Sequence, residues 1–440
     1  MARPGAGTSL SNVATPADTE VLFPSSTRRA MRAACLGNVV EWYDFAIYGA
    51  LGTIFVPVFF ATEDGPQILL AAFAVYGTAF FLRPLGAVVF GRRADSRGRR
   101  VVLVTVILLM TGATATVGLL PGYAVIGMVA PIALVVLRAA QGLAAGGELG
   151  VAAVFMVEYA PDHRRGAYAA WHTATLALGL ACGLGVAGLL ALLPADALAA
   201  GWWRVAFLMA LPFGLVGVYM RRRVRETPRF VQLQQADVRV SAPIHVVWAE
   251  NRAALRTGFT VVAAGSLTFN TFFVFLPNHL VATTSRTLSA ALLAAILGLL
   301  AAAVAALTFG RLSDRVGRRP VVRGCLAGLI VCAVPMSLAA HSGSLLALTL
   351  AEVTAGVCVG GILSVSMVAE MFPTGVRASG LSLTAGLAAA LVGGTAPFVD
   401  QVLFTATGLE VLPALYAAAV AGAALAALWS WPETAFAALD

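Results

Sequence analysis

Long apolar runs separated by short polar stretches dominate this chain of 440 residues. A run such as 101–120 has about the 20 residues that a membrane-spanning helix needs, and it lacks the apolar–polar alternation of barrel strands. The pattern predicts an all-α polytopic membrane protein with twelve transmembrane helices. The predicted spans are 33–58, 67–91, 101–120, 131–159, 166–193, 202–221, 256–280, 287–310, 321–340, 345–371, 376–403 and 411–431.

The polar stretch 222–255 divides these spans six and six, and it carries a cluster of Arg residues. The predicted organisation therefore has two six-helix halves. Its parts are an N-terminal tail at 1–31, a first bundle at 32–221, a central loop at 222–255, a second bundle at 256–431 and a C-terminal tail at 432–440.

The placement of Arg predicts which way the helices face, because loops on the cytoplasmic side keep positive charge. If the N-terminus is cytoplasmic, all but four of the 29 basic residues fall on cytoplasmic segments. The exceptions are Arg204 and Arg286 outside, and Arg83 and Arg138 within spans. Both termini and the central loop are thus predicted to be cytoplasmic.

Composition supports lipid as the solvent of this chain. It is 60% hydrophobic and 11% charged, whereas soluble domains are about half apolar and a quarter charged. The net charge is +8, all 29 basic residues are Arg, and Ala and Gly are abundant. This indicates a bacterium with a GC-rich genome rather than a nucleic-acid partner. Five Cys without CxxC or Cys/His spacing predict no disulfide framework and no metal site.

An internal repeat relates the two halves. Residues 91–100 after the second span match residues 310–319 after the eighth, and 158–165 match 370–377. Matching signals six spans apart predict parallel repeats about an axis along the membrane normal. The repeated loop residues are Gly91, Asp95, Gly98 and Arg99 in the first half and Gly310, Asp314, Gly317 and Arg318 in the second.

These loops offer charges that can hold the cytoplasmic side closed. Asp95 and Asp314 can accept bonds from a helix N-terminus, where the helix dipole favours anions. Arg99 and Arg318 can pair with carboxylates at the ends of the fourth and tenth spans, Glu158 and Glu370. Alternatively, the loops serve only to fix topology.

Ionisable residues inside spans are functional candidates, because charge in hydrocarbon is costly unless it meets a cavity or a partner. Glu41 and Asp44 are three residues apart and share a helical face. Repulsion between two carboxylates and the loss of water both favour the protonated form, so the pair is suited to carrying a proton. The alternative is that Glu41 is solvated at the interface.

The second and fourth spans add further charged candidates. Arg138, Gln141 and Glu148 fall on one narrow stripe of the fourth span, which indicates either a transport role or a structural buried ion pair. Arg83 can grip a substrate carboxylate with two hydrogen bonds or neutralise Glu41 or Asp44.

Weaker cavity candidates are polar or aromatic residues within spans. Such side chains can bind substrate, but inside membrane helices they often bond to a neighbouring helix instead. They are Asn38, Tyr48, Trp171, His172 and Asn270.

Five segments together identify a family resemblance. They are 37–45 in the first span, 83–86 in the second, the two repeated loops, 138–148 in the fourth span, and 225–228. Across 32–435 the chain resembles the major facilitator superfamily, and within it the metabolite:H+ symporter family that includes proline/betaine, shikimate and α-ketoglutarate permeases. Asn270 departs from the aromatic residue expected there, and the short C-terminus departs from osmosensing relatives that carry a coiled coil.

The resemblance implies a monomeric carrier that uses no cofactor beyond the proton gradient. It places Arg138 and Glu148 in the transport path, and it implies that the repeated loops latch an outward-open state. We therefore expect a proton-driven symporter of a small organic acid or zwitterion in a bacterial cytoplasmic membrane, and not an enzyme. The alternatives are an exporter or proton antiporter on the same fold, and a receptor or scaffold, which predicts broken motifs.

Replacing both Glu41 by Gln and Asp44 by Asn is expected to abolish uphill uptake, because no carboxylate of the pair is left to carry a proton. Membrane insertion is expected to persist. Accumulation of radiolabelled substrate in vesicles measures the effect, and accumulation against a gradient by the double variant would show that the coupling assignment is wrong.

Overall fold

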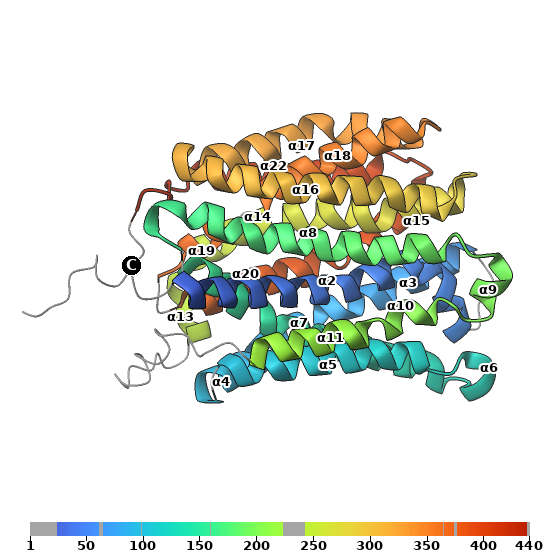
Figure 1. Ribbon diagram of the computed structural model, residues 1–440. Helices are drawn as coiled ribbons and strands as arrows, with labels where there is room; N and C mark the ends of the chain where they lie inside the picture. Colours follow the sequence, from blue (N-terminus) through green and yellow to red (C-terminus); the bar gives the residue numbers. More distant parts are fainter. Residues whose placement is uncertain are drawn as a thin grey trace, which may run out of the picture.

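The computed structural model describes residues 24–60, 65–97, 99–158, 160–222, 243–363, 365–373 and 376–437. Within these ranges the chain is a bundle of helices that run roughly parallel or antiparallel to one another (Figure 1). The first-half helices α4, α5 and α11 lie along one side of the bundle in this view, and the second-half helices α17, α18 and α22 lie along the opposite side.

The first half contains ten α-helices and a short 3₁₀ turn within the described ranges. They are α2 Pro24–Phe59, α3 Gly65–Phe81, α4 Arg83–Arg97, α5 Arg99–Leu119, α6 Tyr123–Ile126, α7 Val129–Glu158, η1 Asp162–Arg164, α8 Arg165–Leu190, α9 Ala195–Ala199, α10 Arg204–Leu208 and α11 Ala210–Arg222.

The second half contains ten α-helices and two π-helical turns within the described ranges. They are α13 Pro243–Glu250, α14 Arg252–Asn270, η2 Thr271–Phe275, α15 Leu276–Thr283, α16 Leu288–Val316, α17 Arg318–His341, α18 Leu345–Ile362, α19 Val365–Glu370, α20 Arg377–Ala388, η3 Ala389–Gly393, α21 Ala396–Thr407 and α22 Leu412–Trp429.

Eleven helical segments of the described chain are long and apolar enough to cross a membrane. Each coincides with one predicted span. The remaining prediction, 202–221, corresponds to the shorter apolar stretch Arg204–Tyr219, where α10 ends and α11 begins. Pro212 lies just after this break, and its ring obstructs the carbonyl four residues earlier.

The predicted tail and the predicted central loop both contain helix within the described residues. Helix α2 already begins at Pro24, inside the predicted tail, in a stretch of Ala and Arg that favours helix. Helix α13 lies within the predicted loop 222–255, where Val247 is completely buried, and α14 begins at Arg252 rather than 256.

Prolines explain why three spans are not regular α-helices. Pro84 lacks an N–H and disturbs the carbonyl of Phe80, and the helix breaks between α3 and α4 at Leu82. The π-helical turns η2 and η3 each end shortly before a proline, Pro277 and Pro397. Single π-turns of this kind are common at functional sites.

Glycines allow close packing at equivalent places in both halves. A Cβ at Gly142 or Gly146 of α7 would overlap the carbonyl oxygens of Ala79 and Arg83. In the second half, a Cβ at Gly356 of α18 would overlap the carbonyl oxygen of Gly298 of α16. The repeat seen in the sequence is therefore also a repeat in helix packing.

The two halves meet along α8 and α16, which lie side by side in the middle of the bundle (Figure 1). A Cβ at Gly166, at the start of α8, would lie 2.5 Å from the carbonyl oxygen of Gly310 near the end of α16. At the other end, Gly188 faces Leu292. The two helices are thus antiparallel and in contact along most of their length.

Replacing Gly142 by Ala is expected to destabilise the protein by about 1–3 kcal/mol, because the new methyl group forces α7 away from α3. Thermal unfolding in detergent measures this. Gly112→Ala is the matched control, since nothing lies within 4 Å of a Cβ there, and equal melting temperatures of the two variants would contradict the packing account.

Candidate functional site

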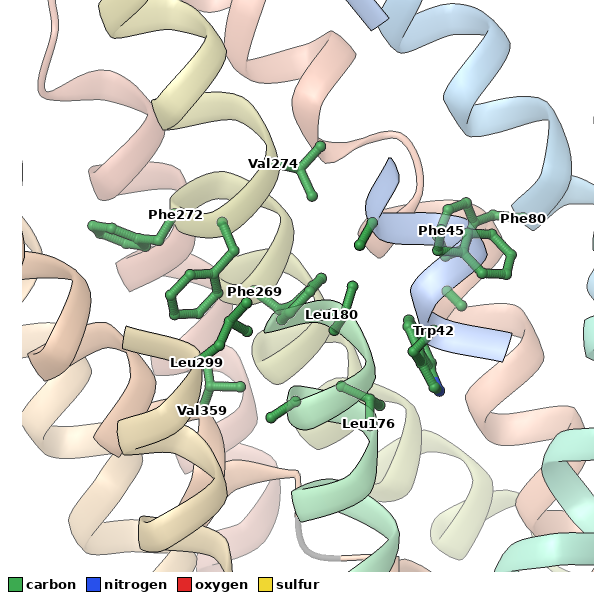
Figure 2. Packing of buried hydrophobic residues seen from close by; sticks show 14 of the residues in the cluster. Trp42, Phe45, Phe80, Leu176, Leu180, Phe269, Phe272, Val274, Leu299 and Val359 are labelled. Carbon is green, nitrogen blue, oxygen red and sulfur yellow. The ribbon is translucent and has the colours of Figure 1, made fainter. Parts of the chain in front are cut away.

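A cavity of about 90 Å³ lies between the two halves. Trp42, Arg83 and His172 line it from the first half, and Phe269 and Asn270 line it from the second. Figure 2 shows Trp42, Leu176 and Phe269 approaching one another from α2, α8 and α14. A water needs roughly 10–15 Å³ of such space, so the cavity has room for a small molecule.

Arg83 is the charged residue of this cavity. Its side chain is buried, and its guanidinium lies over the rings of Trp42, Phe45 and Phe80 at 5.2, 4.6 and 4.4 Å. Its Nε and Nη2 have no hydrogen-bond partner within the described ranges. Because buried donors are normally paired, these atoms are available to an acceptor that enters the cavity.

Glu41 is 5% exposed and lies close enough to Arg83 to act on it electrostatically. This burial does not fit the alternative in which Glu41 is solvated at the interface. The negative charge of Glu41 therefore stabilises the positive charge of Arg83.

Asp44, Arg138 and Gln141 are brought together, but not through a direct ion pair. Thr114 donates to Asp44 Oδ2 at 2.8 Å, and Gln141 Nε2 donates to Thr114 at 2.6 Å. Arg138 donates to Gln141 Oε1 at 2.8 Å and to the carbonyl of Tyr76 at 3.3 Å. Thr114, which sequence reasoning missed, links Asp44 to Gln141 and so to Arg138. It is one of four Thr residues in its span, and nothing in the sequence distinguishes it from the others.

Two other predicted residues, Tyr48 and Glu148, differ in how they relate to Arg138. The guanidinium of Arg138 lies 3.9 Å from the ring centre of Tyr48, so Tyr48 supports a cation by a cation–π contact. Glu148 is buried, but it lies ten residues beyond Arg138, a rise of about 15 Å along the helix.

The weaker candidates separate into three groups. His172 and Asn270 line the cavity. Asn38 bonds across to α8, at the carbonyl of His172 and at Thr175 Oγ1, and accepts a bond from Trp42 Nε1, which orients that ring. Trp171 is 42% exposed and does not line the cavity. Its neighbour His172 is the one of the two that faces the cavity from α8.

At one end of the bundle, a cluster of charges joins the halves; we refer to Asp314, Arg318 and Glu370 as the lock. Asp314 accepts bonds from the backbone N–H groups of Gly166 and Ala167, at the start of α8, at 2.8 and 2.9 Å. Arg318 donates to both carboxylate oxygens of Glu370 at 3.1 and 3.3 Å and to Asp314 at 2.8 Å. A helix N-terminus of the first half is thereby bound to the second half.

The C-terminal segment also takes part in the lock, which sequence reasoning missed. Glu433 accepts from the backbone N–H groups of Arg318 and Arg319 at 2.8 and 3.1 Å. Arg165 of the first half donates to the carbonyl of Ala437 at 2.6 Å and lies 3.7 Å from Glu370. The sequence gives no signal of the contact that Glu433 makes, because its partner Arg318 is 115 residues away.

The equivalent loop of the first half can be placed only in part. Gly98 lies outside the described residues, and so do the side chains of Asp95, Arg99 and Glu158. Gly91 lies within α4, and Gly310 lies within α16. Gly317 has a φ of 105°, which favours glycine, where α16 turns into α17.

The halves also touch on the side of the cavity away from the lock. Tyr76 donates to Asn270 Oδ1 at 3.0 Å, and Asn278 donates to the carbonyl of Gly49 at 3.0 Å. On the lock side, Thr173 donates to the carbonyl of Leu363 at 2.7 Å. The cavity is therefore bounded by contacts between the halves on both sides. No cluster of His, Cys, Asp or Glu suited to a metal ion occurs in the described part of the chain.

Known proteins identify the family of this fold and site. The profile of the Major Facilitator Superfamily matches residues 36–397, with a second match at 258–438. The chain belongs to the major facilitator superfamily. It is 34% identical to the ectoine/proline transporter ProP of Corynebacterium glutamicum, over 93% of this chain and 85% of that protein. It is 33% identical to the α-ketoglutarate permease of Escherichia coli, over 86% and 88%.

A solved structure shares the fold. The xylose transporter XylE of E. coli, in a partially occluded inward-open conformation, matches with a TM-score of 0.69 and 18% identity, over 94% of this chain and all of that one. The prediction of a twelve-helix major facilitator fold is confirmed. The protein is a multi-pass membrane carrier of small molecules and not an enzyme.

Glu370→Gln is expected to weaken the lock, because it removes one of the two carboxylates that pair with Arg318; breaking a buried pair costs about 3 kcal/mol. A cysteine introduced at Leu363, in a background without other cysteines, should then be alkylated about tenfold faster or more. Glu250→Gln, at an exposed position of α13, is the control. An alkylation rate equal to that of the control would contradict the role of the lock.

Proposed function

We propose that this protein is a proton-coupled symporter that imports a small zwitterion, of the betaine, proline or ectoine kind, across a bacterial cytoplasmic membrane. The observation that supports the substrate class is the buried Arg83, with unpaired donors, in a cavity that also contains Trp42 and Phe269. The ectoine/proline transporter named above has a substrate of this class.

The two ends of a zwitterion meet different chemistry in this cavity. A carboxylate can accept two parallel bonds from the guanidinium of Arg83. An ammonium or quaternary nitrogen is attracted to the faces of Trp42 and Phe269. Arg83 is the only Arg, Lys, Asp or Glu among the described lining residues, so a dicarboxylate such as α-ketoglutarate would lack a second cation.

Competition for Arg83 supplies a means of proton coupling. While Glu41 is ionised it holds the charge of Arg83, and a proton on Glu41 releases that charge for the substrate carboxylate. Binding of the proton and of the substrate then favour each other, as linkage requires. Asp44 in its network and Glu148 further along the same half are the other candidate proton carriers.

Alternating access completes the proposal. Two six-helix halves, 32–221 and 256–431 joined by 222–255, rock about the cavity. The excess of Arg on the segments at the lock end supports a cytoplasmic position for that end and for both termini. Opening the lock would release substrate inside, and separating Asn278 from Gly49 would admit it from outside.

Arg83→Lys is expected to weaken zwitterion binding about tenfold or more, since lysine cannot reproduce the two-bond geometry and each tenfold corresponds to about 1.4 kcal/mol. Competition assays in proteoliposomes with betaine, proline, ectoine and α-ketoglutarate measure this. Arg93→Lys, an exposed residue of the same helix, is the control.

The same assay also tests the substrate class and the direction of transport. Preference of the wild type for α-ketoglutarate over every zwitterion would contradict the proposed substrate. Reversing the pH gradient across the vesicles separates symport from antiport, and efflux driven by proton entry would identify an exporter instead.

A further inference from the structure

Glu352 of α18 is a carboxylate without a partner in the second half. It is 0% exposed, and neither Oε1 nor Oε2 has a hydrogen-bond partner within the described ranges. An ionised carboxylate in such surroundings would cost several kcal/mol. The low-energy form of this side chain in the closed conformation is therefore the neutral acid.

The position of Glu352 in its half matches that of Arg138 in the other. Arg138 precedes Gly142 by four residues and Gly146 by eight, and Glu352 precedes Gly356 and Gly360 by the same steps. Both sets of glycines pack their helix against the second helix of the half. The repeat thus places an ionisable residue at the same depth in each half, paired in one and unpaired in the other.

The elements packed against α18 supply no charge to Glu352. The ionisable residues of α14 and α16 are near the lock end, where Asp314 is occupied by Arg318 and the start of α8. On α17, His341 bonds the carbonyl of Ser337 and lies 3.9 Å from Glu410. The remaining ionisable side chains of these elements are Arg252, Arg256, Arg311, Arg315, Arg318, Arg319, Arg323, Cys325 and Cys332, and η2 has none.

The π-helical turn η2 lies next to Glu352. A Cβ at Gly298 would lie 2.6 Å from the carbonyl oxygen of Glu352 and 2.7 Å from the ring of Phe273 in η2. Phe273 therefore covers the crossing of α16 and α18 at this level. Because η2 belongs to the span that bonds Tyr76 and Gly49 of the first half, separation of the halves displaces the segment that covers Glu352.

We propose that Glu352 is a proton-binding residue of the second half that takes part in coupling. It is protonated while the cavity is closed, and it gives its proton to water when movement of η2 admits water to α18. This rests on the proposed proton symport and adds an acidic site in the second half to the candidates Glu41, Asp44 and Glu148 of the first half.

The test uses full-length protein in proteoliposomes, with a zwitterion that the wild type transports. At about 100 mV, one proton moved with a neutral substrate drives roughly fiftyfold accumulation. Glu352→Gln is expected to lose this accumulation and the associated proton influx. Its exchange of labelled for unlabelled substrate should stay within about twofold of wild type and lose its dependence on pH, because exchange needs no net proton release.

Controls separate this inference from the proposed function. If the wild type moves no protons with substrate, the symport proposal fails, whatever Glu352 does. If the wild type couples and Glu352→Gln accumulates substrate with the same proton-to-substrate ratio, the inference about Glu352 is overturned. Glu250→Gln should match wild type throughout. If Glu352→Gln loses exchange as well, the variant Glu352→Asp decides. Coupled uptake by Glu352→Asp but not by Glu352→Gln supports a proton site, and loss of coupled uptake in both variants overturns the inference.

Discussion

The burial of charge in a bundle that lipid surrounds is the constraint on which the rest of this structure depends. A bilayer offers no water to a lone Arg or Glu, so each such residue needs a partner, a cavity or a proton. Arg138 has its partners through Gln141, Thr114 and the rings around it. Arg83 keeps two donors for a cavity, and Glu352 has no partner among the described residues. These three states fit a scaffold role for Arg138, the proposed binding site at Arg83 and the proposed proton site at Glu352.

The same constraint explains how the halves can hold together and still separate. The lock uses charged groups and a helix N-terminus at the end of the bundle, where water can replace the bonds when they break. The opposite end uses neutral contacts, from Tyr76 to Asn270 and from Asn278 to Gly49. Between them, small residues let α8 and α16 pack closely, and a closely packed interface of this kind has discrete arrangements rather than a continuous range.

The sequence predicted the spans well because hydrocarbon imposes a strong length rule, and it predicted Arg318 beside Glu370 as the structure places them. It missed what depends on tertiary position. Val247 is buried in a segment that looks like a loop, and Glu433 acts far from its partner in sequence. Trp171 and His172 were both weaker candidates, and only His172 lines the cavity, because two adjacent helical positions differ by about 100° in direction. Glu352 carries no motif, and only its burial and its counterpart Arg138 reveal it.

The central claim is that contacts at the two ends of the cavity open in turn, and distances across α8 and α16 test it most directly. Spin labels would replace His163 and Val316 at the lock end in one protein, and Leu192 and Ser285 at the other end in a second, all exposed positions. The distance between the two labels of each protein would be measured by double electron–electron resonance, without and with saturating zwitterion, at two pH values. The account predicts opposite changes, one pair lengthening under conditions where the other shortens or stays closed. Simultaneous lengthening of both pairs, or fixed distances under every condition, would contradict it.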